Sequence, residues 1–330
     1  MVRMKTIRWG MIGCGSVTEV KSGPAFNKAP HSKLIAVMRR DAEKLKQYAE
    51  RHQVPYFFTD ANELIHHPEV DAVYIATPPK FHEAYAIAAM QAGKPVYVEK
   101  PMGLDVAACE RMNAYSKKSG IALVIAHYRR ALPLFVEVKR LVDAKIIGDI
   151  ISVRIEMLKY DSGLLDPVEN WRIDPSIAGG GYFYDLAPHQ LDLVFYFFGK
   201  AKSYKGTAFN KANLYKAEDT VTGEIELENG IQFKGNWCFC VDKGEETDIF
   251  EIIGTKGKIS FPVFGHTITL TTGDKEEQID FEPPKHNQQN FIEKIVAYLN
   301  GVGENPCSAE DALQSMRVME AFVYGNNELK

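Results

Sequence analysis

Asp185 and His189 have the residue types and the spacing of a proton-transfer pair. They lie four residues apart after the glycine run 179–181, so a helix that begins by Asp185 places them on one face. A histidine near a carboxylate is a good proton acceptor at neutral pH. Pro188 is tolerated in the first turn of a helix, which predicts a helix start close to Asp185. The alternative is a capping aspartate and a buried histidine.

Lys100 is a second group that can do chemistry. It follows Glu99 at the end of the apolar run Val96–Val98, which predicts a short strand. A lysine at the carboxyl end of such a strand can lower the pKa of a substrate hydroxyl or stabilise a developing alkoxide. A plain surface role is the alternative for an isolated lysine. Its location makes Lys100 a candidate.

A glycine turn follows the first predicted strand, Lys5–Ile12, and opens a helix predicted over residues 17–28. The turn reads Gly13-Cys14-Gly15-Ser16-Val17-Thr18. Gly13 permits a tight turn, and Gly15 lets the backbone approach a pyrophosphate at the helix start. The motif, with Ser16 and Val17, therefore predicts a dinucleotide site. Thr18 in place of a third glycine predicts slightly looser packing of the helix on the strand.

The end of the second predicted strand, Leu34–Met38, distinguishes the two nicotinamide cofactors. NAD sites place an acidic group here for the ribose hydroxyls, whereas the 2′-phosphate of NADP requires a cation. This chain has Arg39 and Arg40, followed by Asp41 as a predicted helix cap. We therefore expect NADP, with NAD as the second possibility. A solvated arginine pair is the alternative.

Another candidate turn follows the apolar run Val70–Ala76, which reads as a strand buried on both faces. Ligands of open α/β sheets bind beyond the carboxyl ends of such strands. Thr77 and Pro78 are therefore expected to lie beside the nicotinamide. His82 follows closely, and we expect a structural or loop role for it rather than a catalytic one.

The first 130 residues alternate strand and helix patterns, which predicts a doubly wound parallel sheet over residues 1–127. From about residue 148, apolar residues alternate with period two, so residues 128–330 are expected to form an α+β domain with a large, mostly antiparallel sheet. The C-terminal helices of this domain can pack back on the first domain. Asn229-Gly230 predicts a hairpin turn in which both residues tolerate positive φ. The apolar run 237–241 belongs either to the core or to the open face of this sheet.

The chain has 330 residues and a net charge of −4, with no basic stripe. We therefore expect no binding to nucleic acid or membrane. No uncharged apolar run approaches the roughly 18 residues of a membrane span, and no signal peptide is evident. Five cysteines, an odd number, indicate reduced thiols and a cytoplasmic protein. Cys238 and Cys240 are expected to share one face rather than form a redox or zinc pair. No ligand pair has zinc spacing, so no metal is expected.

Together these motifs resemble the Gfo/Idh/MocA oxidoreductase family, the relatives of glucose–fructose oxidoreductase and inositol dehydrogenase. The resemblance rests on Gly13-x-Gly15, the segment 76–82, Glu99-Lys100-Pro101, the glycine run with Asp185, His189 and Asp192, and the C-terminal segment 309–321. It covers nearly the whole chain. It implies an NAD(P)-dependent enzyme that oxidises or reduces a carbinol of a sugar, polyol or similar cyclic substrate.

The resemblance also assigns roles to individual residues. His189 resembles the family's proton acceptor, Asp185 its partner, and Lys100 the lysine that assists the proton. Trp171 and Arg172 resemble a segment that approaches the nicotinamide and the substrate in some members. Tyr128 resembles the family's crossover into the second domain, where it can line the pocket. The cofactor and substrate residues are thus expected to be Gly13, Gly15, Ser16, Val17, Arg39, Arg40, Thr77, Pro78, His82, Glu99, Lys100, Tyr128, Trp171, Arg172, Asp185 and His189.

Two other functions are open to such a chain. Some relatives bind the dinucleotide but act as redox-sensing regulators, and these tend to lose the lysine or the histidine that this chain keeps. Others hydrolyse glycosides through a transient oxidation, without net cofactor turnover. The family commonly forms dimers or tetramers through the open face of the second sheet, so we expect a homodimer or homotetramer.

Overall fold

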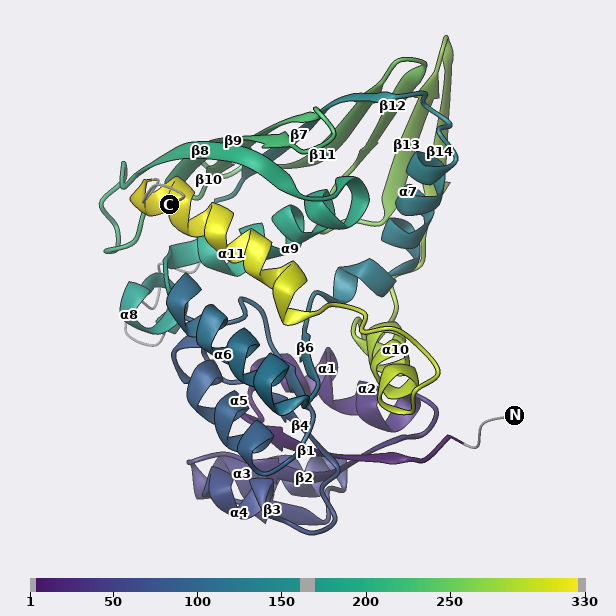
Figure 1. Ribbon diagram of the computed structural model, residues 1–330. Helices are drawn as coiled ribbons and strands as arrows, with labels where there is room; N and C mark the ends of the chain where they lie inside the picture. Colours follow the sequence, from purple (N-terminus) through teal and green to yellow (C-terminus); the bar gives the residue numbers. More distant parts are fainter. Residues whose placement is uncertain (1–3, 161–169, 326–330) are drawn as a thin grey trace. The chain divides into compact units, whose positions relative to one another are not determined.

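A computed structural model describes residues 4–160 and 170–325 of the chain. Its first sheet has six strands, all paired in parallel, in the order β3-β2-β1-β4-β5-β6 (Figure 1). The strand order reverses between β1 and β4, and ligands of open α/β sheets bind at this switch point. The strands are β1 (Ile7–Ile12), β2 (Ser32–Met38), β3 (Tyr56–Phe58), β4 (Ala72–Ile75), β5 (Val96–Val98) and β6 (Leu123–Ile125).

Helices connect these strands, and aspartates cap two of them, one at Asp41 as predicted. The Asp41 carboxylate accepts the Lys44 N–H at 3.0 Å, and that of Asp105 accepts the Ala108 N–H at 2.7 Å. Gly120, with φ 70°, ends the second of these helices. The elements are α1 (Ser16–Val20), α2 (Gly23–Lys28), α3 (Ala42–His52), α4 (Ala61–Ile65), η1 (Pro79–Phe81), α5 (His82–Gln91), α6 (Val106–Ser119), η2 (Tyr128–Ala131) and α10 (Gln289–Leu299).

The prediction of one helix over residues 17–28 is wrong, because two short helices, α1 and α2, occupy this segment. Pro24 stands at the start of α2, where its missing N–H costs nothing, and so it favours a new helix over a continued one. Gly23 packs so closely that a Cβ would collide with the Thr18 carbonyl and the Tyr48 hydroxyl. The break therefore brings α2 against both α1 and α3.

The chain divides into two compact units. The first comprises residues 1–132 and 284–313, and the second comprises 133–283 and 314–330. The first unit thus extends a few residues beyond the predicted boundary at 127 and adds a later segment. That segment is joined to the sheet by buried side-chain hydrogen bonds, among them Tyr97 Oη to Gln288 Oε1 at 2.7 Å.

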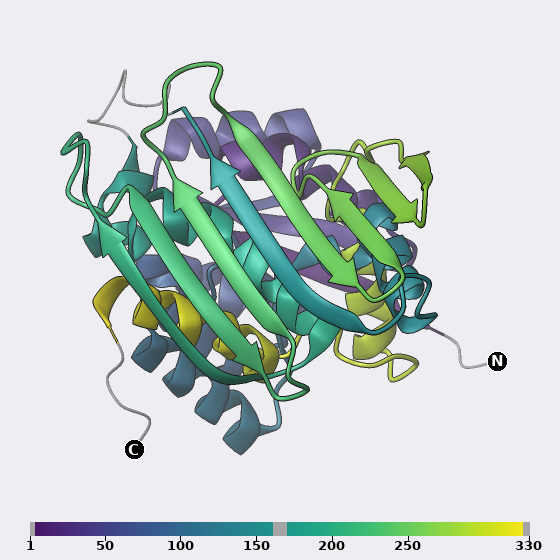
Figure 2. The same ribbon diagram turned by 90° about the horizontal axis from the view of Figure 1, so that it is seen from above.

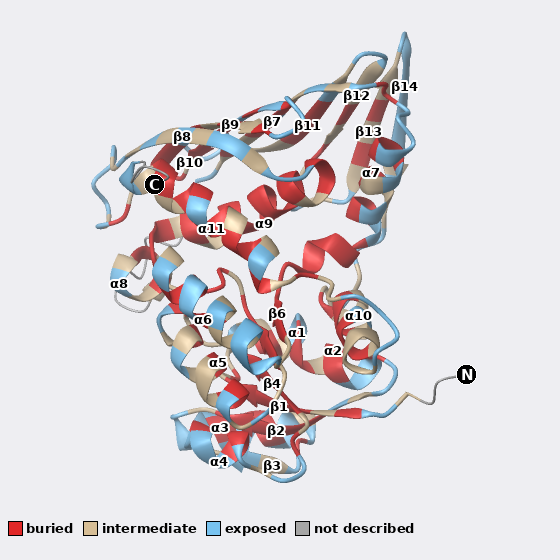
Figure 3. Ribbon diagram, viewed as in Figure 1, coloured by how far each residue is buried: buried red, intermediate tan, exposed pale blue. Residues whose placement is uncertain are grey.

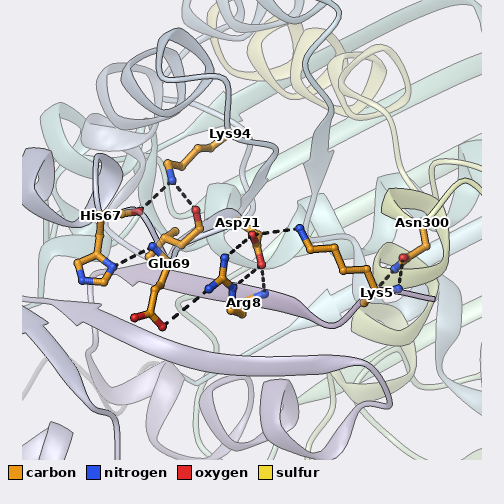
Figure 4. Close-up of polar contacts among 8 residues, drawn as sticks. Lys5, Arg8, His67, Glu69, Asp71, Lys94 and Asn300 are labelled. Carbon is orange, nitrogen blue, oxygen red and sulfur yellow. Dashed lines mark hydrogen bonds and ion pairs between the residues drawn. The ribbon is translucent and has the colours of Figure 1, made fainter. Parts of the chain in front are cut away.

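Polar side chains link the amino-terminal ends of β1 and β4 (Figure 4). The Arg8 guanidinium donates from Nε and Nη2 to the two carboxylate oxygens of Asp71 at 2.9 and 3.0 Å. Lys5 Nζ lies 3.6 Å from the same carboxylate, and Glu69 lies 3.8 Å from Arg8. Asn300 Oδ1 accepts the Lys5 N–H at 2.7 Å. These contacts hold the start of the sheet to the end of α10.

The second unit contains an eight-stranded sheet in the order β14-β13-β12-β11-β7-β10-β9-β8 (Figure 2). Only β7 and β10 pair in parallel, so the predicted, mostly antiparallel sheet is confirmed. The strands are β7 (Ile150–Leu158), β8 (Ala201–Phe209), β9 (Thr220–Leu227), β10 (Gln232–Cys238), β11 (Thr247–Gly254), β12 (Gly257–Phe261), β13 (Thr267–Thr272) and β14 (Lys275–Asp280). The helices are α7 (Pro133–Asp143), η4 (Trp171–Ile173), α8 (Pro175–Ala178), α9 (Gly181–Phe198) and α11 (Ala309–Tyr324), and the division between the units passes through α11.

Helices α9 and α11 pack on one face of this sheet, where the core lies (Figure 3). The Trp237 ring is fully buried, with the rings of Phe183 and Phe322 at 5.1 and 6.2 Å. Phe239 is only 2% exposed, so the apolar run 237–241 contributes to the core. Gly223 lies under Phe322, where a Cβ would collide with the ring.

The predicted hairpin joins β9 and β10, but its turn differs from the prediction. Only Gly230 has positive φ, 86°, and its N–H donates to the Leu227 carbonyl at 2.9 Å. The loop is longer than two residues, so Asn229 does not need a left-handed conformation. Its side chain instead donates to the Phe198 carbonyl at 2.8 Å.

Three observations on membrane-spanning helices, metal ligands and cysteines bear on function. Within residues 4–160 and 170–325, no helix is both long and apolar enough to cross a membrane. Over the same residues, no group of three or more potential metal-ligating side chains comes together. Cys238 and Cys240 share one face as predicted, with their Sγ atoms 3.5 Å apart and both thiols free.

Candidate active site

The glycine turn after β1 leaves room for a ligand to approach the backbone. Gly13 has φ 96°, and a Cβ there would lie 2.9 Å from backbone atoms of Ala76 and Thr77, so only glycine fits. Its N–H donates to the Met38 carbonyl at 2.9 Å. A Cβ at Gly15 would meet no atom within 4 Å, so that side of the Gly15 backbone is open. The positive φ of Gly13 agrees with the predicted tight turn, and the approach of a pyrophosphate to Gly15 stays a prediction.

The residues after the turn begin α1. Ser16 is exposed and Val17 half-buried, whereas Thr18 is fully buried. Thr18 Oγ1 donates to the Gly15 carbonyl at 2.8 Å, and Tyr48 Oη donates to the Thr18 carbonyl at 3.0 Å. The position that a third glycine would take thus holds a threonine whose hydroxyl and carbonyl are both hydrogen-bonded.

The carboxyl end of β2 carries two cations. Arg39 Nη1 donates to the Cys14 carbonyl at 2.9 Å, which holds this guanidinium beside the glycine turn. The Arg40 guanidinium lies 5.3 Å from the centroid of the Phe81 ring, within the range of a cation–π contact. The backbone hydrogen bond that Asp41 accepts in the cap lowers the pKa of its carboxyl. This carboxylate is thus engaged in capping α3, and the two arginines supply the charge at this edge.

The turn after β4 contains a hydroxyl that no described residue satisfies. Thr77 Oγ1 is buried and has no hydrogen-bond partner among residues 4–160 and 170–325. Buried hydroxyls are almost always paired, so this atom fits a site that receives a bound group. Pro78, half-buried, precedes η1. The glycine turn, this hydroxyl and the two cations together fit an NAD(P) dinucleotide.

His82 holds this turn to the next one. Its ring is fully buried, with Nε2 2.7 Å from the Thr77 carbonyl and Nδ1 3.0 Å from the Pro101 carbonyl. Burial lowers the pKa of His82 to about 4, so the ring is neutral and donates from one nitrogen at a time. Because both nitrogens face backbone carbonyls, His82 supports the cofactor turns rather than offering a polar atom to a ligand.

Glu99, Lys100 and Pro101 follow β5, as predicted. The Glu99 carboxylate is 8% exposed and accepts from Tyr74 Oη at 2.5 Å and Gln288 Nε2 at 2.6 Å. It is thus committed to protein donors. Lys100 is half-buried, and the Lys100–Pro101 peptide bond is cis.

Tyr128 lies in η2 of the first unit and is 7% exposed. The Arg129 guanidinium lies 5.7 Å from the centroid of its ring. The contact of Tyr128 with substrate stays a prediction.

In the second unit, α9 positions the predicted proton-transfer residues, but its start differs from the prediction. The helix begins at Gly181, so Pro188 lies in its interior rather than in the first turn. Gly179 and Gly180, with φ of 92° and 168°, lie outside the helical region, so the helix begins only after them. Pro188 has no N–H to donate within the helix, which makes an interior position unusual for a proline.

Asp185 and His189 lie one helical turn apart on α9. His189 is 5% exposed, and its ring lies 5.8 Å from the Phe264 ring in an edge-on arrangement. The partly exposed Asp185 carboxylate accepts from Arg172 Nε at 3.2 Å. Two residues predicted from separate motifs, Arg172 and Asp185, are thus brought together. The predicted partnership of Asp185 with His189 stays a prediction.

A pocket of about 220 Å³ opens beside this ion pair. The Arg172 guanidinium also lies 4.6 Å from the centroid of the Trp171 ring. Asn170 Nδ2 donates to Tyr182 Oη at 2.7 Å, which fixes the phenol at the pocket wall. The lining residues are Lys159, Arg172, Tyr182, Asp185, Leu186 and Phe239. Two cations, a carboxylate, a phenol and apolar surface can bind a hydroxyl-rich molecule by hydrogen bonds and stacking.

The lining residues Lys159, Tyr182, Leu186 and Phe239 were not among the predicted site residues. Tyr182 lies three residues before Asp185, and helical spacing alone could have indicated it. Lys159 and Phe239 follow β7 and β10, two parallel neighbours whose carboxyl ends share an edge. The sequence pattern does not show that these strands pair, so it carried no signal for either residue.

Comparison with known proteins agrees with this architecture. The family described as "Oxidoreductase family, NAD-binding Rossmann fold" matches residues 7–127, and the GFO/IDH/MocA C-terminal domain matches residues 135–260. The chain is 43% identical over 318 residues to "Oxidoreductase P35" from Formosa agariphila, covering 96% of this chain and 98% of that protein. It is 26% identical over 325 residues to a 1,5-anhydro-D-fructose reductase from Ensifer adhaerens, with 96% and 95% covered. The solved structure of an oxidoreductase from Thermotoga maritima, 27% identical, has a TM-score of 0.84, with 96% and 95% covered.

The chain therefore belongs to the GFO/IDH/MocA oxidoreductase family, as the motifs predicted. It is an NAD(P)-binding enzyme of the dehydrogenase or reductase type, with a Rossmann domain followed by a large, mostly antiparallel sheet.

Proposed function

We propose that this protein uses NADP to oxidise or reduce a carbinol or carbonyl carbon of a sugar, polyol or similar cyclic compound. The observation that carries the proposal is the pocket beside α9, where Asp185 and Arg172 stand next to Tyr182. Such a set presents both donors and acceptors to adjacent hydroxyl groups, with aromatic surface for the ring faces. The name of the Ensifer adhaerens relative, 1,5-anhydro-D-fructose reductase, supports a sugar-like substrate.

The first unit supplies the cofactor residues in this proposal. A nicotinamide cofactor, when bound, supplies the hydride donor or acceptor. Gly13, Gly15, Ser16 and Val17 would hold the pyrophosphate, and Thr77 with Pro78 would line the nicotinamide end. Arg39 and Arg40 would bind the 2′-phosphate, and their charge favours NADP over NAD.

The protein's own groups manage the proton. His189 accepts the hydroxyl proton during oxidation and returns it during reduction. Lys100 stabilises the developing alkoxide by its charge, and Asp185 accepts a hydrogen bond from a substrate hydroxyl. Trp171, Arg172 and Tyr128 complete the proposed substrate contacts.

The test is a panel of neutral sugars and polyols incubated with the purified protein and NADP⁺ or NAD⁺, followed by the absorbance of reduced nicotinamide. The proposal expects one or more compounds to be oxidised faster with NADP⁺. Tight cofactor binding without turnover of any compound in either direction would favour a redox-sensing regulator. Release of sugar from a glycoside without net cofactor change would favour hydrolysis through transient oxidation.

The proposal includes self-association as a homodimer or homotetramer in the cytoplasm. Ion pairs such as Arg154–Glu251 and Lys234–Glu224, at 3.2 and 3.1 Å, lie on the sheet of the second unit. Ion pairs of this kind fit the polar rim of an interface between copies. Sedimentation velocity at two salt concentrations tests self-association, and a monomer at both concentrations would refute the proposed homodimer or homotetramer.

A further inference from the structure

A chain of buried polar side chains runs beneath the strand end that carries Lys100. Tyr74 Oη donates to Glu99 Oε1 at 2.5 Å and lies 3.1 Å from Ser22 Oγ. Gln288 Nε2 donates to the same Glu99 oxygen at 2.6 Å, and Tyr97 Oη donates to Gln288 Oε1 at 2.7 Å. The five residues come from four separate parts of the first unit: the link between α1 and α2, β4, the end of β5, and the segment before α10.

Each member of this chain is buried. Ser22, Tyr74 and Tyr97 are fully buried, and Gln288 and Glu99 are 1% and 8% exposed. A carboxylate withdrawn from water in this way depends on protein donors. Burial, and then the charge of Glu99, raises the pKa of both tyrosines well above its ordinary value, so both hydroxyls keep their protons as donors.

The amide of Gln288 can occupy only one orientation. Its oxygen accepts from Tyr97 and its nitrogen donates to Glu99, so a flip of the amide would lose both hydrogen bonds. Its backbone is anchored as well, because the Gln288 N–H donates to the Lys21 carbonyl at 3.4 Å. The neighbouring His286 Nδ1 lies 2.7 Å from the Val20 carbonyl. The segment therefore presents the amide to Glu99 from a fixed backbone.

The other oxygen of Glu99 faces the lysine. Glu99 Oε2 accepts the Lys100 N–H at 3.3 Å. The orientation of this carboxylate is set by the donors on Oε1, and of these only Gln288 comes from outside the parallel strands and their loops. Any rotation of the carboxylate moves the acceptor away from the Lys100 backbone.

We propose that Gln288 is a positioning residue for Lys100, acting through the Glu99 carboxylate. The inference rests on the proposed function for the chemical role of Lys100, while the contacts themselves do not. Gln288 lies 188 positions from Lys100, in the segment that returns to the first unit. It sets the backbone from which the lysine side chain extends, so its loss lowers turnover without removing any group that contacts the cofactor.

The experiment compares Gln288→Met with Gln289→Met, each in the full-length protein. Methionine keeps the length and removes both hydrogen bonds. Gln289 is a matched control because its side-chain amide donates to Glu293, on its own helix, at 3.1 Å. The first readout is hydrogen–deuterium exchange of the backbone amide of Lys100. We expect roughly tenfold faster exchange in Gln288→Met and no change in Gln289→Met, with the other strands of the sheet unaffected.

The second readout is a double-mutant cycle on turnover of the fastest substrate in the sugar panel. Gln288→Met should lower kcat roughly 10- to 100-fold with the Kd for NADPH within about twofold. In a Lys100→Met background, Gln288→Met should lower kcat no further, because both substitutions abolish the same contribution, that of the Lys100 side chain.

Unchanged exchange at the Lys100 amide overturns the proposal, as does an additive effect on kcat in the Lys100→Met background. Faster exchange spread evenly over the first unit also overturns it, since that shows a loss of general stability. If Lys100→Met turns over substrate at the wild-type rate, the proposed role of Lys100 fails, and the exchange result still decides the positioning by Gln288.

Discussion

Replacing Arg39 with aspartate is expected to shift the cofactor preference from NADPH towards NADH. The Arg39 guanidinium is held 2.9 Å from the Cys14 carbonyl, beside the turn that would bind the pyrophosphate. A charge-assisted hydrogen bond to a 2′-phosphate contributes about 1–3 kcal/mol, which corresponds to roughly 5- to 150-fold in Kd. The new carboxylate repels a phosphate, whereas it can accept from the 2′-hydroxyl of NADH. The affinity for NADPH should therefore fall much further than the affinity for NADH.

The assay is a parallel titration of wild type and variant with NADPH and NADH, followed by nicotinamide fluorescence. Lys46→Asp is the matched control, because it makes the same charge change on the exposed side of α3, where Lys46 lies 3.9 Å from Glu50. The control should leave the ratio of the two Kd values unchanged. The reasoning is refuted if Arg39→Asp also leaves that ratio at its wild-type value.

Three further substitutions test separate parts of the structure. Lys100→Met should lower kcat roughly 100-fold or more while the Kd for NADPH stays within about twofold in a fluorescence titration, and full activity would remove Lys100 from the reaction. Burial raises the pKa of Asp71, but hydrogen bonds from Arg8 outweigh it and lower that pKa below 3.8. Asp71→Asn should therefore cost about 1–3 kcal/mol of unfolding free energy near pH 7. The difference should shrink as the pH falls through the lowered pKa of Asp71, and equal urea midpoints at neutral pH would contradict this. Gly223→Ala places a Cβ against the Phe322 ring and should lower the free energy of unfolding by about 1–3 kcal/mol, so an unchanged denaturation midpoint would refute the close packing.

Much of the first sheet could be predicted because its strands are buried on both faces. The run Ala72–Ile75 is fully buried, so it is continuously apolar in sequence. Asp41 and Asp105 could be recognised as caps from their position before helical patterns. The strand Tyr56–Phe58 was missed, since it has three residues and no fully buried position.

The second unit was harder to predict where charged residues occupy a strand. β8, Ala201–Phe209, has no buried residue and contains two lysines, so its apolar alternation is weak. The interior position of Pro188 was missed because a proline ordinarily marks a first turn. In α9 the non-helical φ of Gly179 and Gly180 sets the start instead.

The residues of the candidate site also divide into those that local sequence predicts and those that long-range contacts bring together. Gly13 and Lys100 could be identified because local spacing places them at strand ends. The contact of Gln288 with Glu99 could not, because it joins residues 189 positions apart. Phe239 reaches the pocket only because β10 pairs with β7, a long-range pairing that no local pattern encodes.

The most direct test of the central claim is to follow the transferred hydride with a deuterium label. The protein is incubated with NADPH carrying deuterium at the transferable position and with a panel of sugars that bear a carbonyl group. The account predicts a product alcohol with deuterium on its carbinol carbon, formed by wild type and lost in His189→Asn, which still binds NADPH. Deuterium in no product, with NADPH bound and intact, would contradict the claim that this protein is a hydride-transferring enzyme for such compounds.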